Sequence, residues 1–410
     1  MVNETNAVSL IRNKLFIYFF LTLLASTLSV SFYLFTVNWY VVDELQLEAK
    51  LGLVFFASSV PRLVFMLIGG AIADRVNKAT VMLLSDLTKG LLLVAVIVLL
   101  LVDLFSIGIL IGLSFVFGLL DAFFWPSSSS LMPSLVSRDQ LTRANSIVQT
   151  TQRASTIIGP LLAGLVIGFG SYEVMFAFVS AMLLLAAIVD LIIRKNVSYD
   201  QDELNESSSV WHNIKEGFAY LKQSPFMLAL MLSSVSMNLF LSGPMQVGLP
   251  LFARDILNGD EFTYSLLSGM LGVGTLVGAL LIGVLNVRQK RGMVALTGIM
   301  LLGLFMVAFS LTDSLLLSLM FISLIGLVIS TIDVPIISAI QAHTEKKYIG
   351  RMMSLMSFAS MGLIPVSYLL TSFLISLGLT IDTILLSSSV CLMVVGVFVL
   401  VFAKSLRTVN

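Results

Sequence analysis

The sequence predicts an all-α membrane protein with twelve transmembrane helices, arranged as two six-helix pseudo-repeat bundles. Of its 410 residues, 58% are hydrophobic and 11% are charged, whereas a soluble domain is about one quarter charged. Apolar stretches of about 20 residues recur along the chain, which is the length that a helix needs to cross a bilayer. Weak similarity between the two halves of the chain is the third observation.

Apolar runs, read against turn residues and charges, place the helices in order. The first run, from Leu15 to about Val42, is too long for a signal-peptide core and is expected to stay in the protein. The helices are expected near 15–41, 51–73, 80–102, 105–129, 143–169, 172–193, 225–253, 262–286, 292–312, 315–340, 350–377 and 380–403.

One long polar stretch divides these helices six and six. The predicted domains are an N-terminal bundle at 1–194, a cytoplasmic linker at 195–224 and a C-terminal bundle at 225–410. Four apolar residues at helical spacing in the linker predict a short helix that lies along the inner membrane surface. These residues are Trp211, Ile214, Phe218 and Leu221.

The basic residues predict the orientation in the membrane. Most of the 23 Lys and Arg residues fall on the side of the N-terminus, whereas Lys50 and Arg254 fall on the opposite side. Arg62, Lys89 and Arg153 are predicted at membrane depth. Because cytoplasmic loops carry the excess of basic residues, both termini and the linker are expected in the cytoplasm of a multi-pass plasma-membrane protein.

The two halves align with each other at a nearly constant shift. GGAIADRVNKATVML falls on LIGVLNVRQKRGMVAL, so that Gly70 meets Gly283 and Arg75 meets Arg288. Parallel repeats related by an axis along the membrane normal leave this kind of pattern. Such repeats enclose a cavity between them, which favours transport.

The turn between the second and third helices carries an unusual set of charges. Gly70 permits close helix approach, Asp74 suits the helix dipole, and Arg75 and Lys78 can pair with an acid such as Asp86. We interpret this set as a latch that holds one conformation and opens in another. Simple positive-inside anchoring of the two bases is the alternative.

At this turn the sequence resembles the major facilitator superfamily. PSLVSRDQLTRANSIVQTTQRASTIIGPLLAG, IKEGFAYLKQSPFMLALML and IGRMMSLMSFASMGLIPVSYLLTSF resemble the drug:proton antiporter group of macrolide-efflux and enterobactin-exporter type proteins. Within the fifth helix, Gly159, Pro160 and Gly164 resemble the antiporter signature of that superfamily, although bulkier residues surround them here. The resemblance implies alternating access and is silent on the substrate.

Ionisable residues at membrane depth are candidates for proton or charge coupling, because they are costly there unless they face a cavity or a partner. They are Arg62, Asp121, Arg153 and Asp333. We expect Asp121 to pair with Arg153 or Arg62, with a structural pair as the alternative. Asp333 has no base of its own half at its depth, so it is expected to be desolvated, unless it is solvated or paired with Arg288 or Arg351.

Aromatic, Met and amide side chains suit the adaptable wall of a multidrug site. Core or lipid-facing packing is the alternative for each. The candidates for a substrate cavity are Tyr33, Asn38, Phe123, Phe124, Trp125, Met237, Asn238, Met245 and Gln246.

Other chemistry finds little support in the sequence. GMLGVGTLVGALLIG lacks the spacing of a dinucleotide loop, and Gly274-x-x-x-Gly278 predicts close helix packing instead. No enzyme activity, cofactor, metal or nucleic-acid partner is expected. The predicted function is proton-coupled efflux of amphipathic small molecules by a monomer that binds its substrate and protons within the bilayer. A lipid or siderophore exporter and a transporter-like sensor are the alternatives.

Overall fold

The computed structural model describes residues 10–73, 76–197, 225–285, 291–343 and 360–402. These residues are almost entirely helical and contain no strand, which confirms the predicted all-α class. The chain forms two compact units. Unit 1 comprises Met1–Val37 and Ala57–Asn205, and unit 2 comprises Asn38–Phe56 and Glu206–Asn410.

Each predicted helical segment contains a helix within the residues that the structure describes. Within the described residues, eight helices are long and apolar enough to cross a membrane, and Leu296–Ser310 and Ser360–Ser376 are shorter apolar helices. The chain is therefore a multi-pass membrane protein, and the number of twelve spans stays a prediction.

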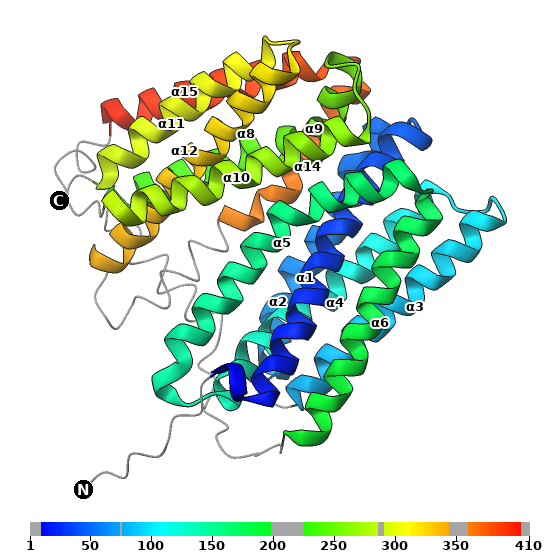
Figure 1. Ribbon diagram of the computed structural model, residues 1–410. Coiled ribbons are helices and arrows are strands. Elements are labelled where there is room, and N and C mark those ends of the chain that lie inside the picture. Colours follow the sequence, from blue (N-terminus) through cyan, green and yellow to red (C-terminus); the bar gives the residue numbers. More distant parts are fainter. Residues whose placement is uncertain (1–9, 74–75, 198–224, 286–290, 344–359, 403–410) are drawn as a thin grey trace, which may run out of the picture. The chain divides into compact units, whose positions relative to one another are not determined.

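Unit 1 is built from long helices that Figure 1 draws from blue to green. The Asn77 side chain caps the third helix by accepting a hydrogen bond from the Thr80 amide at 3.2 Å. The fourth helix continues past Pro126 and Pro133, so it is longer than predicted. The helices are α1 (Lys14–Trp39), α2 (Glu48–Ala73), α3 (Lys78–Leu101), α4 (Ile107–Leu135), α5 (Leu141–Phe169) and α6 (Tyr172–Asn196).

Small residues set the spacing of these helices. A Cβ atom at Gly118 of α4 would overlap the backbone of Ser58 on α2, and one at Gly159 of α5 would overlap the side chain of Ser31 on α1. On α6, Ser180 donates a hydrogen bond to the Gly90 carbonyl of α3 at 2.9 Å. The backbones of neighbouring helices therefore approach closely, as small residues allow in membranes.

Unit 2 contains the later helices, drawn from green to red in Figure 1. Gly274 and Gly278 of the helix Glu261–Leu285 lie against the backbones of Ser323 and Leu327, which confirms the predicted close packing. The elements are α8 (Pro225–Gln246), α9 (Gly248–Leu251), η4 (Phe252–Ile256, a π-helix), α10 (Glu261–Leu285), α11 (Arg291–Ser310), α12 (Leu315–His343), α14 (Ile364–Ser376) and α15 (Ile381–Phe402).

Residues 38–56, which comprise the end of α1, the connection to α2 and the start of α2, belong to unit 2. Gly52 donates its amide to the Ser372 hydroxyl of α14 at 2.7 Å, and the rings of Phe55 and Tyr368 lie 5.4 Å apart. This connection includes the π-helix η2 (Tyr40–Glu44).

The two π-helices support the internal repeat. Tyr40–Glu44 and Phe252–Ile256 have equal length, and each is followed by a residue with positive φ, Gln46 at 49° and Asn258 at 50°. The spacing from Tyr40 to Phe252 equals that from Gln46 to Asn258. A matching backbone deviation at matching positions is what duplication of one half would leave.

Candidate functional site

The centre of the candidate site is a buried ion pair in unit 1. Lys89 of α3 places Nζ 2.6 Å from Oδ1 of Asp121 on α4, and the two side chains are 2% and 12% exposed. The ammonium also lies 5.2 Å from the centroid of the Phe124 ring. Pairing and the aromatic face offset part of the cost of removing both charges from water.

Asp86 lies one turn before Lys89 and faces α1. It accepts a hydrogen bond from the Ser26 hydroxyl at Oδ2, while Oδ1 has no hydrogen-bond partner among the described residues. The carboxyl group is fully buried. Asp86 is therefore held between two helices and lacks a full set of donors.

Asp190 of α6 has the same arrangement. It accepts a hydrogen bond at Oδ1 from the Thr22 hydroxyl at 2.8 Å, and Oδ2 has no partner in the described part of the chain. Sequence reasoning missed this residue because Arg194 and Lys195 follow it, so that the segment reads as a cytoplasmic helix end. A lone Asp in the run AAIVDLII was the signal that could have found it.

The partner expected for Asp121 was wrong. Asp121 pairs with Lys89, whereas Arg153 of α5 is exposed and Arg62 of α2 is half-buried. Sequence spacing gives the depth of a residue in its helix, but the rotation of α3 decides which neighbour Lys89 meets. The described hydrogen bond of Asp86 is with Ser26, and its expected pairing with the turn between α2 and α3 stays a prediction, because Arg75 lies outside the described residues.

The latch itself is only partly described. Asp74 and Arg75 lie outside the described residues, as does the predicted amphipathic helix of the linker. Gly70 lies in the last turn of α2, and the Lys78 ammonium lies 3.4 Å from the Ser130 carbonyl oxygen of α4. The latch stays a prediction.

The antiporter-like motif of α5 lies along α1. Gly159 contacts Ser31, and one turn earlier the hydroxyl oxygens of Ser155 and Thr27 lie 2.9 Å apart. The helix continues through Pro160, and Gly164 is buried. These residues allow a close α1–α5 contact, and their part in antiport stays a prediction.

Three of the four aromatic candidates for a substrate cavity in unit 1, namely Tyr33, Phe124 and Trp125, are already engaged in packing. The Tyr33 ring stacks on Phe117 with centroids 4.4 Å apart, and its hydroxyl lies 3.2 Å from the Ser114 hydroxyl. Phe124 is part of the buried core, with Trp125 packed against it, and Phe123 is half-buried.

The remaining cavity candidates belong to unit 2. The Asn38 amide donates to the Tyr264 hydroxyl at 2.9 Å, and the Asn238 amide donates to the Ser234 carbonyl at 2.9 Å. Met237 and Met245 are buried, and Gln246 is half-buried. Their contribution to a binding cavity stays a prediction.

Asp333 lies on α12 with an exposed side chain. Its expected part in proton coupling stays a prediction.

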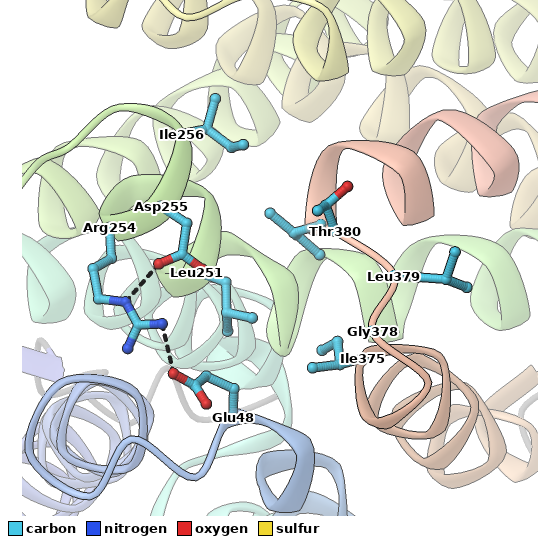
Figure 2. Close-up of a pocket in the computed structure, with 10 residues that line it drawn as sticks. Glu48, Leu251, Arg254, Asp255, Ile256, Ile375, Gly378, Leu379 and Thr380 are labelled. Carbon is cyan, nitrogen blue, oxygen red and sulfur yellow. Dashed lines mark hydrogen bonds and ion pairs between the residues drawn. The ribbon is translucent and has the colours of Figure 1, made fainter.

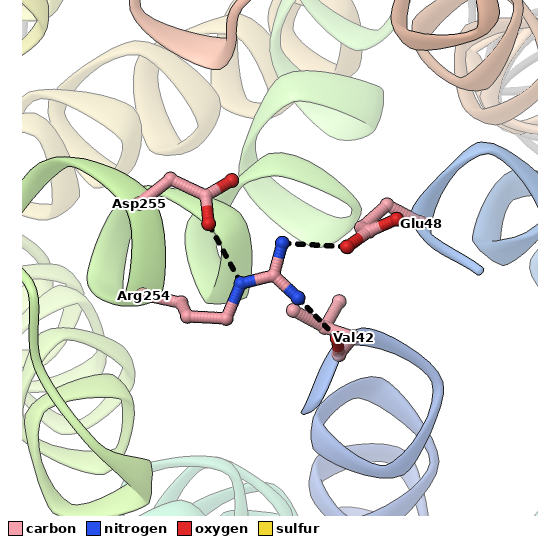
Figure 3. Close-up of polar contacts among 4 residues, drawn as sticks. All are labelled: Val42, Glu48, Arg254 and Asp255. Atoms are coloured by element: carbon pink, nitrogen blue, oxygen red, sulfur yellow. Dashed lines mark hydrogen bonds and ion pairs between the residues drawn. The ribbon is translucent and has the colours of Figure 1, made fainter. Parts of the chain in front are cut away.

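A second polar cluster lies in unit 2 around Arg254 of η4 (Figure 3). The guanidinium donates to the Val42 carbonyl, to Glu48 at 2.5 Å and to Asp255 at 2.6 Å. Burial lowers the pKa of Arg254, but the hydrogen bonds to Asp255 and Glu48 outweigh burial and raise it. Sequence reasoning placed Arg254 on the outer side and assigned it no contact.

This Arg254 cluster borders a small cavity (Figure 2). The cavity has a volume of about 380 Å³ and is open to solvent. Glu48, Arg254 and Asp255 form its polar wall, and its apolar wall includes Leu251, Ile375 and Ile381. Two of the three acceptors of Arg254, Val42 and Glu48, lie in residues 38–56. Arg254 therefore links residues 38–56 to η4.

Comparison with known proteins gives a family and a fold. The sequence profile of the Major Facilitator Superfamily matches residues 19–368. Macrolide efflux protein A of Enterococcus faecalis is 27% identical over 296 residues, which cover 70% of this chain and 88% of that protein. Multidrug efflux pump Tap of Mycolicibacterium fortuitum is 28% identical over 332 residues, 78% of each chain.

Solved structures show the same fold. The POT family transporter PepTSo has a TM-score of 0.73 at 12% identity, over 97% of this chain and 99% of its own. The nucleoside transporter NupG has a TM-score of 0.76 at 11% identity, over 95% and 99%. At these identities the likeness concerns the fold alone.

Proposed function

The chain belongs to the Major Facilitator Superfamily of membrane transporters, and from this premise we propose that it exports amphipathic small molecules in exchange for protons. The similarity to a macrolide efflux protein and a multidrug efflux pump supports this substrate class. The aromatic, Met and amide side chains that the sequence predicts for a substrate cavity would suit such molecules.

The single observation that carries proton coupling is the buried polar network of unit 1. It comprises the Lys89–Asp121 pair together with Asp86 and Asp190. Ionisable groups at membrane depth are expensive and commonly mark ion pathways or proton relays. A chain that only needed to fold could have placed apolar residues at these positions at lower cost.

We further propose twelve spans, a monomer in the plasma membrane, and both termini in the cytoplasm. The distribution of Lys and Arg supports this orientation. Cys391 is the only cysteine, so a Cys391→Ser background allows one introduced cysteine at a time to be labelled. Lys195→Cys should react from the cytoplasmic side and Lys50→Cys from the outside; the reverse pattern would overturn the orientation.

The latch belongs to the same proposal. Asp74, Arg75 and Lys78 follow Gly70 at the end of α2, where two helices must part if the cytoplasmic side opens. Asp74→Asn should lose transport while the protein still inserts into the membrane. Transport at the wild-type rate, at equal expression, would refute the latch.

Dye uptake into everted membrane vesicles tests the proposed function. An exporter will accumulate a fluorescent amphipathic dye in energised vesicles, and nigericin, which collapses the pH gradient, will abolish uptake. Valinomycin with potassium, which collapses the electrical potential alone, is the matched control. Uptake that survives nigericin would refute proton coupling, and absence of uptake would favour a sensor.

A further inference from the structure

Two buried carboxyl groups of unit 1 face the same side of α1. Thr22 and Ser26 lie one helical turn apart, so their hydroxyls project from one face. Thr22 donates to Asp190 on α6, and Ser26 donates to Asp86 on α3. These hydrogen bonds to adjacent turns of one helix bring the two carboxyl groups near each other.

The helix ends place these groups at one depth. At a rise of about 1.5 Å per residue, Asp86 lies about 12 Å from the start of α3 at Lys78, and Asp190 lies about 9 Å from the end of α6 at Asn196. Thr22 lies about 12 Å from the start of α1 by the same measure. The sequence predicts that all three helix ends are cytoplasmic.

The charges around the two carboxyl groups do not balance. The charged and polar groups that face them are Thr22 and Ser26 from α1, Lys89 from α3 and Asp121 from α4. Lys89 is engaged by Asp121 at 2.6 Å. Asp86 and Asp190 are left with one neutral hydroxyl donor each.

On each carboxyl group, one oxygen atom is available to bind a proton. Oδ1 of Asp86 and Oδ2 of Asp190 have no hydrogen-bond partner among the described residues, and both side chains are fully buried. An ionised carboxylate accepts hydrogen bonds only, and burying it without donors is costly. Binding of a proton removes the charge and supplies a donor.

We propose that Asp86 and Asp190 together bind one transported proton at this site on α1. The inference rests on the proposed proton-coupled export and names the acceptor within it. In the step, a proton leaves hydronium and forms an O–H bond on one carboxylate oxygen, and water is released. The second carboxylate keeps its charge, and the pair loses one of its two like charges.

Proton binding would then act on the packing of α3 against α6. Two close carboxylates repel each other strongly in a buried setting, and one proton removes that repulsion. The Ser180 hydrogen bond to Gly90 marks the close contact of these two helices. The protonated pair therefore favours the tight α3–α6 arrangement, and release of the proton loosens it.

Infrared difference spectroscopy of the purified full chain in lipid nanodiscs tests the site directly. Above about pH 6 exposed Asp and Glu side chains are ionised, so a carbonyl band of protonated carboxyl in this range reports a buried group. The wild type should show a band that falls as the pH rises and that shifts in heavy water. Asp86→Asn and Asp190→Asn should each lose most of this band.

Variants near the site separate proton binding from a structural role. Thr22→Val should change the frequency of the band, because the hydroxyl donor to Asp190 is removed. Ser180→Ala is the matched control, since it removes a buried hydrogen bond between the same helices without touching either carboxyl group, so the frequency of the band should not change. Retention of the band in both Asn variants would overturn the site, and so would a band whose frequency Thr22→Val does not change.

The failure of the site and of the proposed function are distinguishable. Nigericin-sensitive dye uptake with an unchanged band in both Asn variants would refute the Asp86–Asp190 site and leave proton-coupled export standing. A pH-dependent band that the Asn variants lose, together with nigericin-insensitive uptake, would confirm proton binding by the two carboxyl groups and refute both coupling and the transport of that proton.

Discussion

The buried network of unit 1 and the Arg254 cluster of unit 2 use the same chemistry in different surroundings. Lys89 and Asp121 are 2% and 12% exposed, whereas Arg254 and Glu48 are 26% and 22% exposed. Lys89 and Asp121 form one ion pair, while Arg254 donates to three acceptors. Loss of a partner should therefore be costly in unit 1 and tolerable in unit 2.

The largest effect is expected at Lys89. Lys89→Met leaves Asp121 buried without its cation, which should lower the free energy of unfolding by about 3–5 kcal/mol. Thermal unfolding in detergent measures the loss. The double variant Lys89→Met with Asp121→Leu should recover most of it, because an apolar pair of similar volume replaces the ion pair. A double variant as unstable as the single one would contradict this account.

Close helix contact holds the buried network in place, and α4 offers a matched pair of glycines to test it. Gly118→Ala would press a methyl group onto the backbone of Ser58, and we expect a loss of about 1–3 kcal/mol. Gly112 faces open space, so Gly112→Ala should be neutral or stabilising by up to about 1 kcal/mol. Equal effects of the two substitutions on thermal unfolding would show that α2 and α4 adapt readily.

Substitution in the Arg254 cluster should destabilise the protein less than substitution in the buried network, and this loss should depend on salt. Arg254→Gln removes charge-assisted hydrogen bonds that are partly exposed, so we expect a loss of about 1 kcal/mol in the free energy of unfolding. The loss should shrink at high ionic strength, unlike that of Lys89→Met, since salt screens exposed charges. The control is Lys50→Gln, an exposed base in the same connection. A salt-independent loss at Arg254 would erase the contrast between the two regions.

The sequence could predict how far along its helix a charged residue lies, but not which neighbouring helix its side chain faces. Asp121, Asp86 and Lys89 stood out because charge is scarce in apolar runs, and all three lie in the buried network. Their pairing depends on helix rotation, which is set by contacts such as Gly90 against Leu184, and no spacing along one helix reveals it. The exposure of the Asp333 side chain could not be predicted for the same reason, since depth along a helix does not reveal which face a residue occupies.

Residues 38–56 show a second limit of sequence reasoning. Their position in the chain assigns them to the N-terminal half, and the domain boundary near residue 195 follows from the polar linker. Contacts place them with unit 2, through bonds from Gly52 to Ser372 and from Arg254 to Glu48. These contacts join segments that lie far apart in the sequence, and neither segment carries a local sequence pattern that predicts them.

The smallest effect concerns Asp260, an exposed residue of unit 2 that caps α10. Its Oδ1 accepts hydrogen bonds from the Thr263 amide at 2.9 Å and from the Thr263 hydroxyl at 3.0 Å. The hydrogen bond from the Thr263 amide is the main cause that lowers the pKa of Asp260 below its ordinary value of 3.8. The cap thus shows how an acid behaves when donors and water are both present, in contrast to Asp86 and Asp190.

The sign of the pH effect follows from the lowered pKa. The ionised cap contributes stability at neutral pH, and this contribution is lost as the pH falls below 3.8 toward the pKa of the folded protein. Asp260→Ala should lower the free energy of unfolding by about 1 kcal/mol at pH 7, with the difference from the wild type shrinking in acid. Asp260→Asn, which caps about as well, should keep most of the stability without that acid-dependent loss. Thermal unfolding of the three proteins from neutral to acid pH measures this, and parallel curves for wild type and Asp260→Asn would show that the charge of Asp260 adds nothing to the cap.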